Sequence, residues 1–337
     1  MKKAACLCSV AVLPLAALTA AAHHSPAEFD LQRDVILEGT VKDFSWRNPH
    51  VYFELEIDGP GGTTVVQPIE AGGAGNMASL GFDASSVSIG ERVVVQVKPN
   101  KRGGNRTALG WVLTKADGTA IPLHVRAIPQ LEPGDAEASS LAGTWVPQAT
   151  GFAALAVAAR EWPLTEAGRA AVEATREARD ASRSSCVPFG PPALMLMPRP
   201  VIVEVGDTEI TFRLDVMGAE RVVHLGQASH PEPFEPSLHG HSIGHWDGDT
   251  LVVDTVGFEA HPDGYSFDLP SSASKHIVER FTLAADRKHI EYEAVVEDPE
   301  YLAAPVTHRA RWDYRPEKAP SNVPCDVDSA GRFTREE

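Results

Sequence analysis

A histidine and an aspartate lie on either side of a turn sequence in the C-terminal half of the chain. Asp247-Gly248 is a favoured two-residue hairpin turn, and a register set on it pairs His241 with Asp254. Strand side chains alternate between faces, so both would point into the same largely apolar interior. An aspartate that holds an imidazole in a dry pocket fixes its tautomer and favours its protonated form, as in many general bases. The alternative is a buried pair that only fixes the strand register.

A second acid, Glu279, shares one face of a later strand with apolar residues. Burial favours the protonated form of a carboxyl group, which suits a general acid. With His241 as the base and Asp254 orienting it, the site would suit isomerisation, elimination or cyclisation. The alternative is an ion pair of Glu279 with Arg280 or another arginine at the barrel rim. The residues expected to contact a small organic ligand are His245, Phe258 and Arg280.

Histidines near the N-terminus suggest a second kind of chemistry. If a leader is removed directly before His23, the free amine and the imidazole of that residue can chelate one metal ion. Removal one residue earlier gives Ala-His-His, in which the amine, two amides and the imidazole of His24 bind copper in a square plane. Nitrogen ligands in that geometry select Cu(II), and His50 would add an imidazole if the tail folds back. The alternative is a frayed polar tail with incidental histidines.

The first 22 residues have the three parts of a secretory signal peptide. Two lysines precede an apolar run, and small residues follow it at the expected cleavage site. Two of the four cysteines fall within this segment, which leaves Cys186 and Cys325 as one pair in an oxidising compartment. No other stretch is apolar enough to span a bilayer. The sequence therefore predicts export to a bacterial periplasm, a disulfide and no transmembrane anchor.

Composition narrows the classes of protein further. The chain has 337 residues, of which 43% are hydrophobic and 23% charged, values typical of globular proteins rather than disordered chains or coiled coils. Its 46 acidic and 30 basic residues give a net charge of -16. Such a charge repels phosphate backbones, so we expect no nucleic-acid partner. Nothing in the composition specifies an oligomeric state.

The hydrophobic pattern predicts a mainly β chain of two domains. Residues 23–125 show strands, a short helix between the third and fourth, and two more strands, which is the order of a small OB-like barrel. A proline-containing linker, 126–142, precedes a larger domain, 143–337, with one surface helix that Thr165 caps. In this domain an antiparallel meander is expected to close into a barrel. Its eight predicted strands are 201–205, 209–215, 221–225, 241–246, 250–258, 276–283, 289–296 and 307–314.

Two sequence motifs resemble families of uncharacterised exported bacterial proteins. His23-His24-Ser25, together with Asn48-Pro49-His50, is similar to the first family. The run from Gly240 to Phe258, with Val278-Glu279-Arg280-Phe281, resembles the signature of the second. That family usually has a His-Ser-Glu run shortly before its Glu-Arg-Phe, whereas this chain has Ser271-Ser272-Ala273. Neither resemblance implies an activity.

The sequence thus favours an exported protein whose C-terminal barrel binds a small, largely apolar molecule. Acid–base chemistry of the lyase, isomerase or cyclase kind would accompany binding, with no cofactor, and whether the protein is an enzyme stays open. A periplasmic copper-binding protein and a non-enzymatic envelope scaffold are the alternatives. An open pocket around the barrel residues favours the first hypothesis. Convergence of the N-terminal histidines favours the second, and a filled barrel favours the third.

Overall fold

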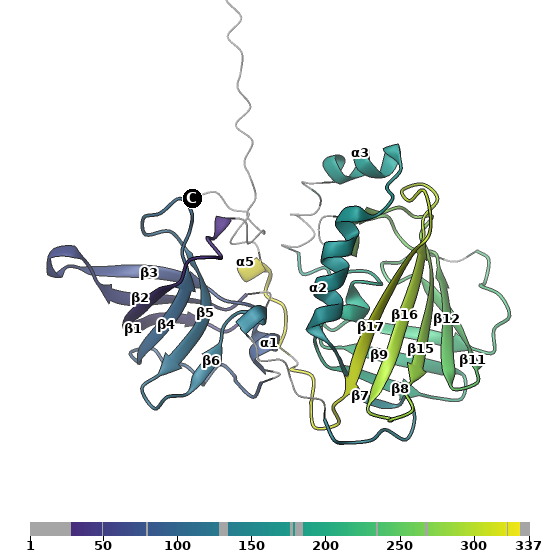
Figure 1. The fold of residues 1–337 in the computed structure, drawn as a ribbon, viewed down its shortest axis with the longest axis horizontal. Coiled ribbons are helices and arrows are strands. Elements are labelled where there is room, and N and C mark those ends of the chain that lie inside the picture. Colours follow the sequence, from purple (N-terminus) through teal and green to yellow (C-terminus); the bar gives the residue numbers. More distant parts are fainter. Residues whose placement is uncertain are drawn as a thin grey trace, which may run out of the picture.

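The computed structural model describes residues 28–330, apart from gaps at Pro49, Ser79, 128–133, 176–177, 179–184, Phe234, 267–268 and Asn322. The predicted signal peptide and the metal candidates His23 and His24 therefore lie outside the described residues. The chain is mainly β and forms two modules that lie side by side (Figure 1). We call them the N-terminal module, β1 to β6, and the C-terminal barrel, which begins at β7.

The N-terminal module has the strand pairing expected of an OB-like barrel. Its sheet order is β3-β2-β1-β4-β5-β6, and β3 also pairs in parallel with β5, which closes a ring of five strands. Inward side chains alternate with outward ones, as Phe53 and Leu55 show on β2. The elements are β1 (Val35–Ser45), β2 (Tyr52–Asp58), β3 (Thr64–Glu70), α1 (Ala74–Ala78), β4 (Arg92–Lys98), β5 (Ala108–Lys115) and β6 (Ala120–Pro122).

The C-terminal barrel is closed by nine strands in the order β10-β11-β12-β15-β16-β17-β7-β8-β9. Eight of them coincide with the predicted strands to within two residues. The ninth, β7, pairs with both β17 and β8 and so completes the ring. The strands are β7 (Gly143–Pro147), β8 (Val201–Val205), β9 (Glu209–Leu214), β10 (Glu220–Leu225), β11 (His241–Asp247), β12 (Thr250–Val256), β15 (His276–Leu283), β16 (His289–Glu297) and β17 (Val306–Tyr314).

The barrel is not a pure antiparallel meander, because β10 and β11 run parallel. Parallel neighbours need a connection that returns the chain to the same end of the sheet. Residues 226–240, the crossing loop, make this connection, and Ser237 fastens the loop to the wall by donating its backbone N–H to Gly257 O over 3.0 Å. Two further strands, β13 (His261–Ser266) and β14 (Leu269–Ser271), form a separate small sheet between β12 and β15.

The predicted surface helix is present as α3 (Glu166–Ala174). Thr165 caps it, as expected, by accepting the backbone N–H of Gly168 at 3.0 Å. A second helix, α2 (Ala149–Ala158), was not predicted, because no side chain caps its start. It packs on β17, where Gly151 lies against Ala310. The remaining short helices are α5 (Val327–Ala330) and the 3₁₀ turns Pro60–Gly62, Val125–Ala127, Ala159–Glu161 and Leu194–Leu196.

Aromatic side chains fill the middle of the barrel. The ring of Phe281 lies 5.1 Å from those of Phe212 and Tyr292 and 5.5 Å from that of Trp312, measured between centroids. All four side chains are essentially excluded from solvent. Residues 194–196, together with Leu155 of α2, join the same core. The middle of the barrel is therefore packed with side chains.

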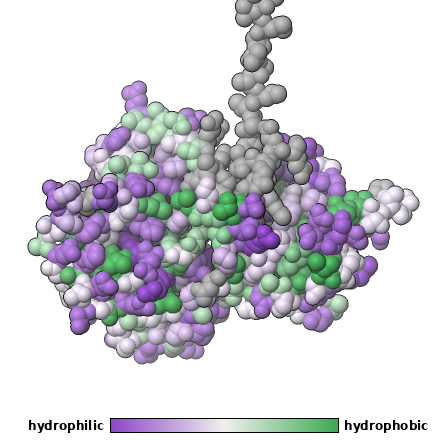
Figure 2. Space-filling model, turned by 180° about the vertical axis from the view of Figure 1, so that it is seen from behind, coloured by the Kyte–Doolittle hydropathy of each residue, from purple (hydrophilic) through white to green (hydrophobic). Residues whose placement is uncertain are grey.

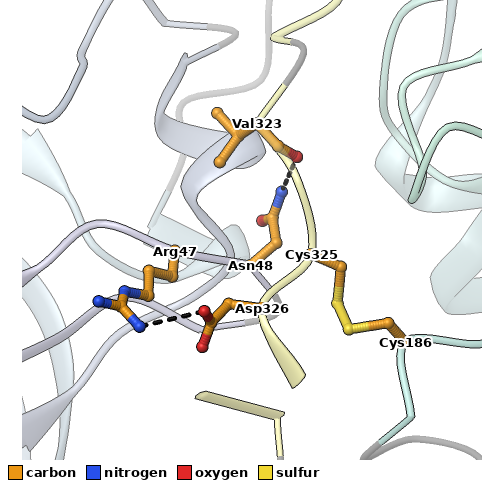
Figure 3. The surroundings of a disulfide bond; sticks show 6 residues. All are labelled: Arg47, Asn48, Cys186, Val323, Cys325 and Asp326. Atoms are coloured by element: carbon orange, nitrogen blue, oxygen red, sulfur yellow. Dashed lines mark hydrogen bonds and ion pairs between the residues drawn. A yellow bond between two sulfur atoms is a disulfide. The ribbon is translucent and has the colours of Figure 1, made fainter. Parts of the chain in front are cut away.

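Cys186 and Cys325 lie at disulfide-bonding distance, as predicted, with Cα atoms 5.9 Å apart (Figure 3). The bond anchors residues 315–330, the C-terminal strap, to the barrel side of the molecule. The strap then reaches the N-terminal module, where Asn48 Nδ2 donates to Val323 O over 2.9 Å and Arg47 pairs with Asp326 at 3.0 Å. Asn48, a residue of the first resemblance motif, thus fastens the strap.

The two modules also touch directly beside the strap. Arg199, which precedes β8, extends its guanidinium over Gly75 of α1, and a Cβ at that glycine would overlap the guanidinium. Close approach of a side chain to the backbone explains why glycine stands there. The strap residue Ser321 donates to the Asp215 carboxylate over 2.8 Å. Contacts from both modules and from the strap therefore converge on one seam.

The surface is mixed in character. Figure 2 shows hydrophilic and hydrophobic residues interspersed over the visible face rather than gathered into one apolar patch. None of the helices in the described part of the chain combines the length and the apolar character that a bilayer-spanning segment requires.

Replacing Cys186 and Cys325 with serine should destabilise the protein. The two cysteines are 139 residues apart, and closing a loop of that length contributes about 4–5 kcal/mol in the chain-entropy model. Urea denaturation of the oxidised protein and of the double serine variant measures the difference. Equal midpoints, or two reactive thiols in the unreduced denatured protein, would show that the bond does not form.

Candidate functional site

The hairpin that carries His241 has a different register from the predicted one. Asp247 pairs with Thr250, so the central turn residues are Gly248 and Asp249, and His241 pairs with Val256 rather than with Asp254. Gly248 has a φ of 61° at the first central position, where type II′ hairpins prefer glycine. The predicted register was therefore wrong by two residues. A shift of two preserves which side chains share a face.

His241 and Asp254 do share a face, but it is the outer one. The neighbours that point inward are Ser242 and Thr255, with exposed fractions of 2% and 0%. The face that carries Leu251 points into the interior, because burial stabilises aliphatic side chains more than it does an imidazole and a carboxylate. The prediction that the pair faces the interior was wrong.

On the outer wall, a residue of the crossing loop joins the two. His230 contacts His241 through their Nδ1 atoms at 2.9 Å and donates from Nε2 to Asp254 Oδ1 at 2.9 Å. Asp254 Oδ2 accepts from His276 Nε2 at 3.1 Å. The His224 ring stacks on the ring of His241, 5.1 Å away. We call these five residues, with Glu297, the outer histidine cluster.

The charge states within this cluster differ from residue to residue. Burial, assisted by His224 and His230, lowers the pKa of His241 and so favours its neutral form. Burial also acts to lower the pKa of His276, but the carboxylates of Asp254 and Glu297 outweigh it and raise that pKa. His276 with two carboxylate partners is thus suited to carry a proton, while His241 is not.

Inside the wall, Glu279 is completely buried and paired with an arginine. Its partner is Arg221 of β10, not the neighbouring Arg280. Arg221 also donates from Nη2 to Thr255 Oγ1 at 2.7 Å, and Tyr292 OH donates to Glu279 Oε1 at 2.8 Å. We call these residues, with Ser242, the inner polar network. The inward position of Glu279 was predicted correctly, whereas His241 lies on the other side of the wall. Glu279 and His241 therefore cannot act on one substrate atom.

Several buried polar atoms of the C-terminal half have no hydrogen-bond partner among the described residues. They include Arg221 Nη1, which belongs to the inner polar network, and His239 Nε2, Ser266 Oγ and Ser271 Oγ. A buried polar atom left without a partner costs roughly 1–3 kcal/mol, and native proteins contain few of them. The group that would repay this cost is a water, an ion or a ligand.

Lys275, directly before β15, is 2% exposed. Its Nζ donates to Gly264 O at 2.9 Å and to Pro191 O at 3.1 Å, and lies 4.1 Å from the centroid of the Phe258 ring. Burial lowers the pKa of this ammonium group to about 7, with the Asp298 carboxylate acting in the opposite direction. An amine of that kind exchanges its proton near neutral pH.

His239, at the end of the crossing loop, has a fixed tautomer. Its Nδ1 lies 3.1 Å from the carbonyl oxygen of Glu220, which can only accept, so Nδ1 carries the proton. Burial, and then the charges of Arg221 and Lys275, lower the pKa of the imidazole. In the resulting neutral form, Nε2 is a bare acceptor.

The predicted ligand contacts do not line one site. His245 is exposed on the outer face near the hairpin turn, and Arg280 pairs there with Asp247 at 2.8 Å. Only Phe258, which is 1% exposed and lies under Lys275, belongs to the interior. His239 bonds to Glu220, the neighbour of Arg221, and Leu238, beside His239, approaches Gly190 next to Lys275. We call Arg221, His239 and Lys275 the polar end of the barrel.

His50, the described member of the predicted copper site, is engaged with an acid. Its Nδ1 lies 2.8 Å from Glu70 Oε1. Burial acts to lower the pKa of His50, but the carboxylate of Glu70 outweighs it and raises that pKa. A proton held there competes with a metal ion. Within the described ranges, no three or more His, Cys, Asp or Glu side chains are arranged to hold a metal. Copper binding through His23 and His24 stays a prediction.

The sequence contained a signal for only one of the three polar-end residues. Arg221 lies two residues before Val223 in a predicted strand, so both side chains point to the same, inward face. Lys275 follows a serine-rich turn and His239 lies in a loop, and neither position has a periodic pattern. His230 also lies in the loop, and its side chain is 15% exposed.

Comparison with known proteins identifies one family and no curated relative. Residues 11–110 match DUF6152, described as a family of unknown function. The match covers much of the N-terminal module and agrees with the expected resemblance to an uncharacterised family. No curated protein matches the chain. Function must therefore be inferred from the site itself.

Replacing Arg221 with methionine should lower the free energy of unfolding by about 3–5 kcal/mol, because the Glu279 carboxylate would remain buried without its cation. Arg280→Met is the matched control, since the exposed pair with Asp247 contributes about 0–1 kcal/mol. The double variant Arg221→Met/Glu279→Leu should be more stable than Arg221→Met alone. Similar losses for the Arg221 and Arg280 variants in urea denaturation would contradict a buried pair.

Proposed function

We propose that this is an exported binding protein whose C-terminal barrel holds a small oxygen-bearing organic molecule at its polar end. The observation that carries the proposal is the set of buried atoms without partners around Arg221 and His239. Export rests on the predicted signal peptide, and the cysteine pair is compatible with it. The sequence predicted a largely apolar ligand, whereas the unpartnered polar atoms favour a polar ligand.

The chemistry of the unpartnered atoms defines the ligand class. Arg221 Nη1 is a donor and needs an acceptor, such as a carboxylate, carbonyl or hydroxyl oxygen. Neutral His239 offers a bare Nε2 and needs a donor, such as a hydroxyl or carboxylic acid proton. The hydroxyls of Ser266 and Ser271 can serve either way. A hydroxy or carboxylic acid of small size satisfies both needs at once.

The same groups support proton transfer better than the predicted pair did. His239 is a neutral imidazole with a fixed tautomer, which is what a general base requires. Lys275, with a pKa of about 7, can give or take a proton at neutral pH. Arg221 contributes guanidinium N–H donors that can hold an oxygen of the ligand. We therefore assign the base role to His239 in place of His241, with Arg221 orienting the ligand.

A scaffold without a ligand explains the polar end less well. A buried ion pair contributes little net stability compared with well-packed apolar residues, so a purely structural barrel has no need of one. The packed aromatic centre already accounts for structural stability, and the polar groups border it, since Tyr292 contacts both Phe281 and Glu279. Ligand binding would explain why charges with a high desolvation cost are buried there.

Native mass spectrometry of the protein purified from its own cell envelope should reveal a bound small molecule. His239→Leu removes one hydrogen bond in a site shielded from water, which costs roughly 1–3 kcal/mol, so the affinity should fall about 5- to 150-fold and the bound fraction with it. His245→Leu, on the exposed outer face, is the matched control and should keep the ligand. An unliganded wild-type protein, or equal occupancy in both variants, would reject the proposal in favour of a scaffold.

A further inference from the structure

The outer histidine cluster and the polar end lie on opposite sides of the same piece of wall. On β11, His241 points outward and Ser242 inward, and on β12 Asp254 points outward and Thr255 inward. The crossing loop touches both sides: His230 docks on the outer cluster, whereas His239 belongs to the polar end. One loop therefore connects the two sets of titratable groups.

The crossing loop also contacts the segment beside Lys275. A Cβ placed on Gly190 would come within 3.1 Å of Leu238 O and 3.4 Å of Lys275 Nζ, so the loop residue Leu238 and Lys275 approach the same glycine. Ser237 holds this part of the loop through its backbone bond to Gly257 O. Moving the loop would withdraw His239 from the polar end.

We propose that the His230–His241 contact is a proton-sensitive latch, which keeps the crossing loop closed over the polar end at neutral pH and releases it in acid. The role in ligand access rests on the proposed function, whereas the loop movement does not. The cluster is interpreted as a proton-binding site because, among the described residues, no group is arranged to hold a metal.

The latch follows from the number of protons that the contact can hold. His230 Nε2 donates to Asp254, so a neutral His230 has a bare Nδ1 that accepts the proton on His241 Nδ1. One further proton leaves the contact intact, because one ring still donates from Nδ1 while the Nδ1 of the other accepts. A second does not, because two N–H groups would then face each other at 2.9 Å. Full protonation of both rings must break the contact.

The neighbouring charges determine the direction of the pH effect. Titratable groups from several elements surround His241. His230 lies on the loop and His224 on β10. Asp254 lies on β12, His276 on β15, and Glu297 beyond them on β16. Burial, His224 and then His230 lower the pKa of His241 in the closed state from the ordinary value of 6.5, and the His230 contribution is lost when the loop leaves. Opening therefore raises the pKa of His241, so closure is lost as the pH falls through the lowered pKa. His276 has a raised pKa, but its partners are on the wall, so its proton does not hold the loop.

Hydrogen exchange at the loop amides tests the latch without any ligand. Two N–H groups bond between the loop and the wall, Ser237 N–H to Gly257 O and Glu259 N–H to Ser237 O, and both bonds require a docked loop. Their protection factors, corrected for intrinsic exchange, should fall between pH 7.5 and pH 5.0 by up to tenfold per pH unit for one linked proton. His230→Gln and His241→Gln each remove one titrating ring and should abolish this pH dependence. His245→Gln, on the same strand and face, should retain it.

Protection that is independent of pH in the wild-type protein overturns the latch. So does a pH dependence that persists unchanged in both His230→Gln and His241→Gln. If one variant fails to fold, the other decides the question, since each removes one half of the same contact. A working latch in a protein that carries no small molecule would refute only the proposed function, because the readout is loop protection alone.

Discussion

The ion pair between Arg221 and Glu279 inside the barrel is the interaction on which the C-terminal half is organised. Removing two charges from water costs several kcal/mol each, and this cost is offset only when hydrogen bonds also satisfy their remaining donors and acceptors. Thr255 and Tyr292 satisfy part of them from β12 and β16, so strands on both sides of Glu279 are tied to β10. Placing β10 there makes it a parallel neighbour of β11, and this parallel step requires the crossing loop.

The crossing loop in turn explains why the two polar clusters are found back to back. It leaves the end of β10, passes over the outer wall at His230 and returns at His239 before β11 begins. The outer side is hydrated and can exchange protons, whereas the inner side is shielded and has donors and acceptors without partners. The disulfide and the C-terminal strap hold the N-terminal module against this barrel at another place, near Asn48.

Much of the fold could be predicted from sequence because strand periodicity and capping are local. Alternation located eight barrel strands, and Thr165 marked the start of α3. The candidate site could not be predicted in the same way. Periodicity shows that His241 and Asp254 share a face but not which face is inside. The turn around Gly248 also allows two registers that differ by two residues and put the same side chains on the same face. The approach of His230 and His239 depends on a loop path that has no periodic signal.

The central claim is that the unpartnered atoms at the polar end bind a small molecule. A high-resolution crystal structure of the protein purified from its own cell envelope tests it most directly. Connected density of an organic molecule, within hydrogen-bond distance of Arg221 Nη1 and His239 Nε2, is the expected result. Separate water peaks that satisfy both atoms, or side chains packed against them with no space between, would contradict the account.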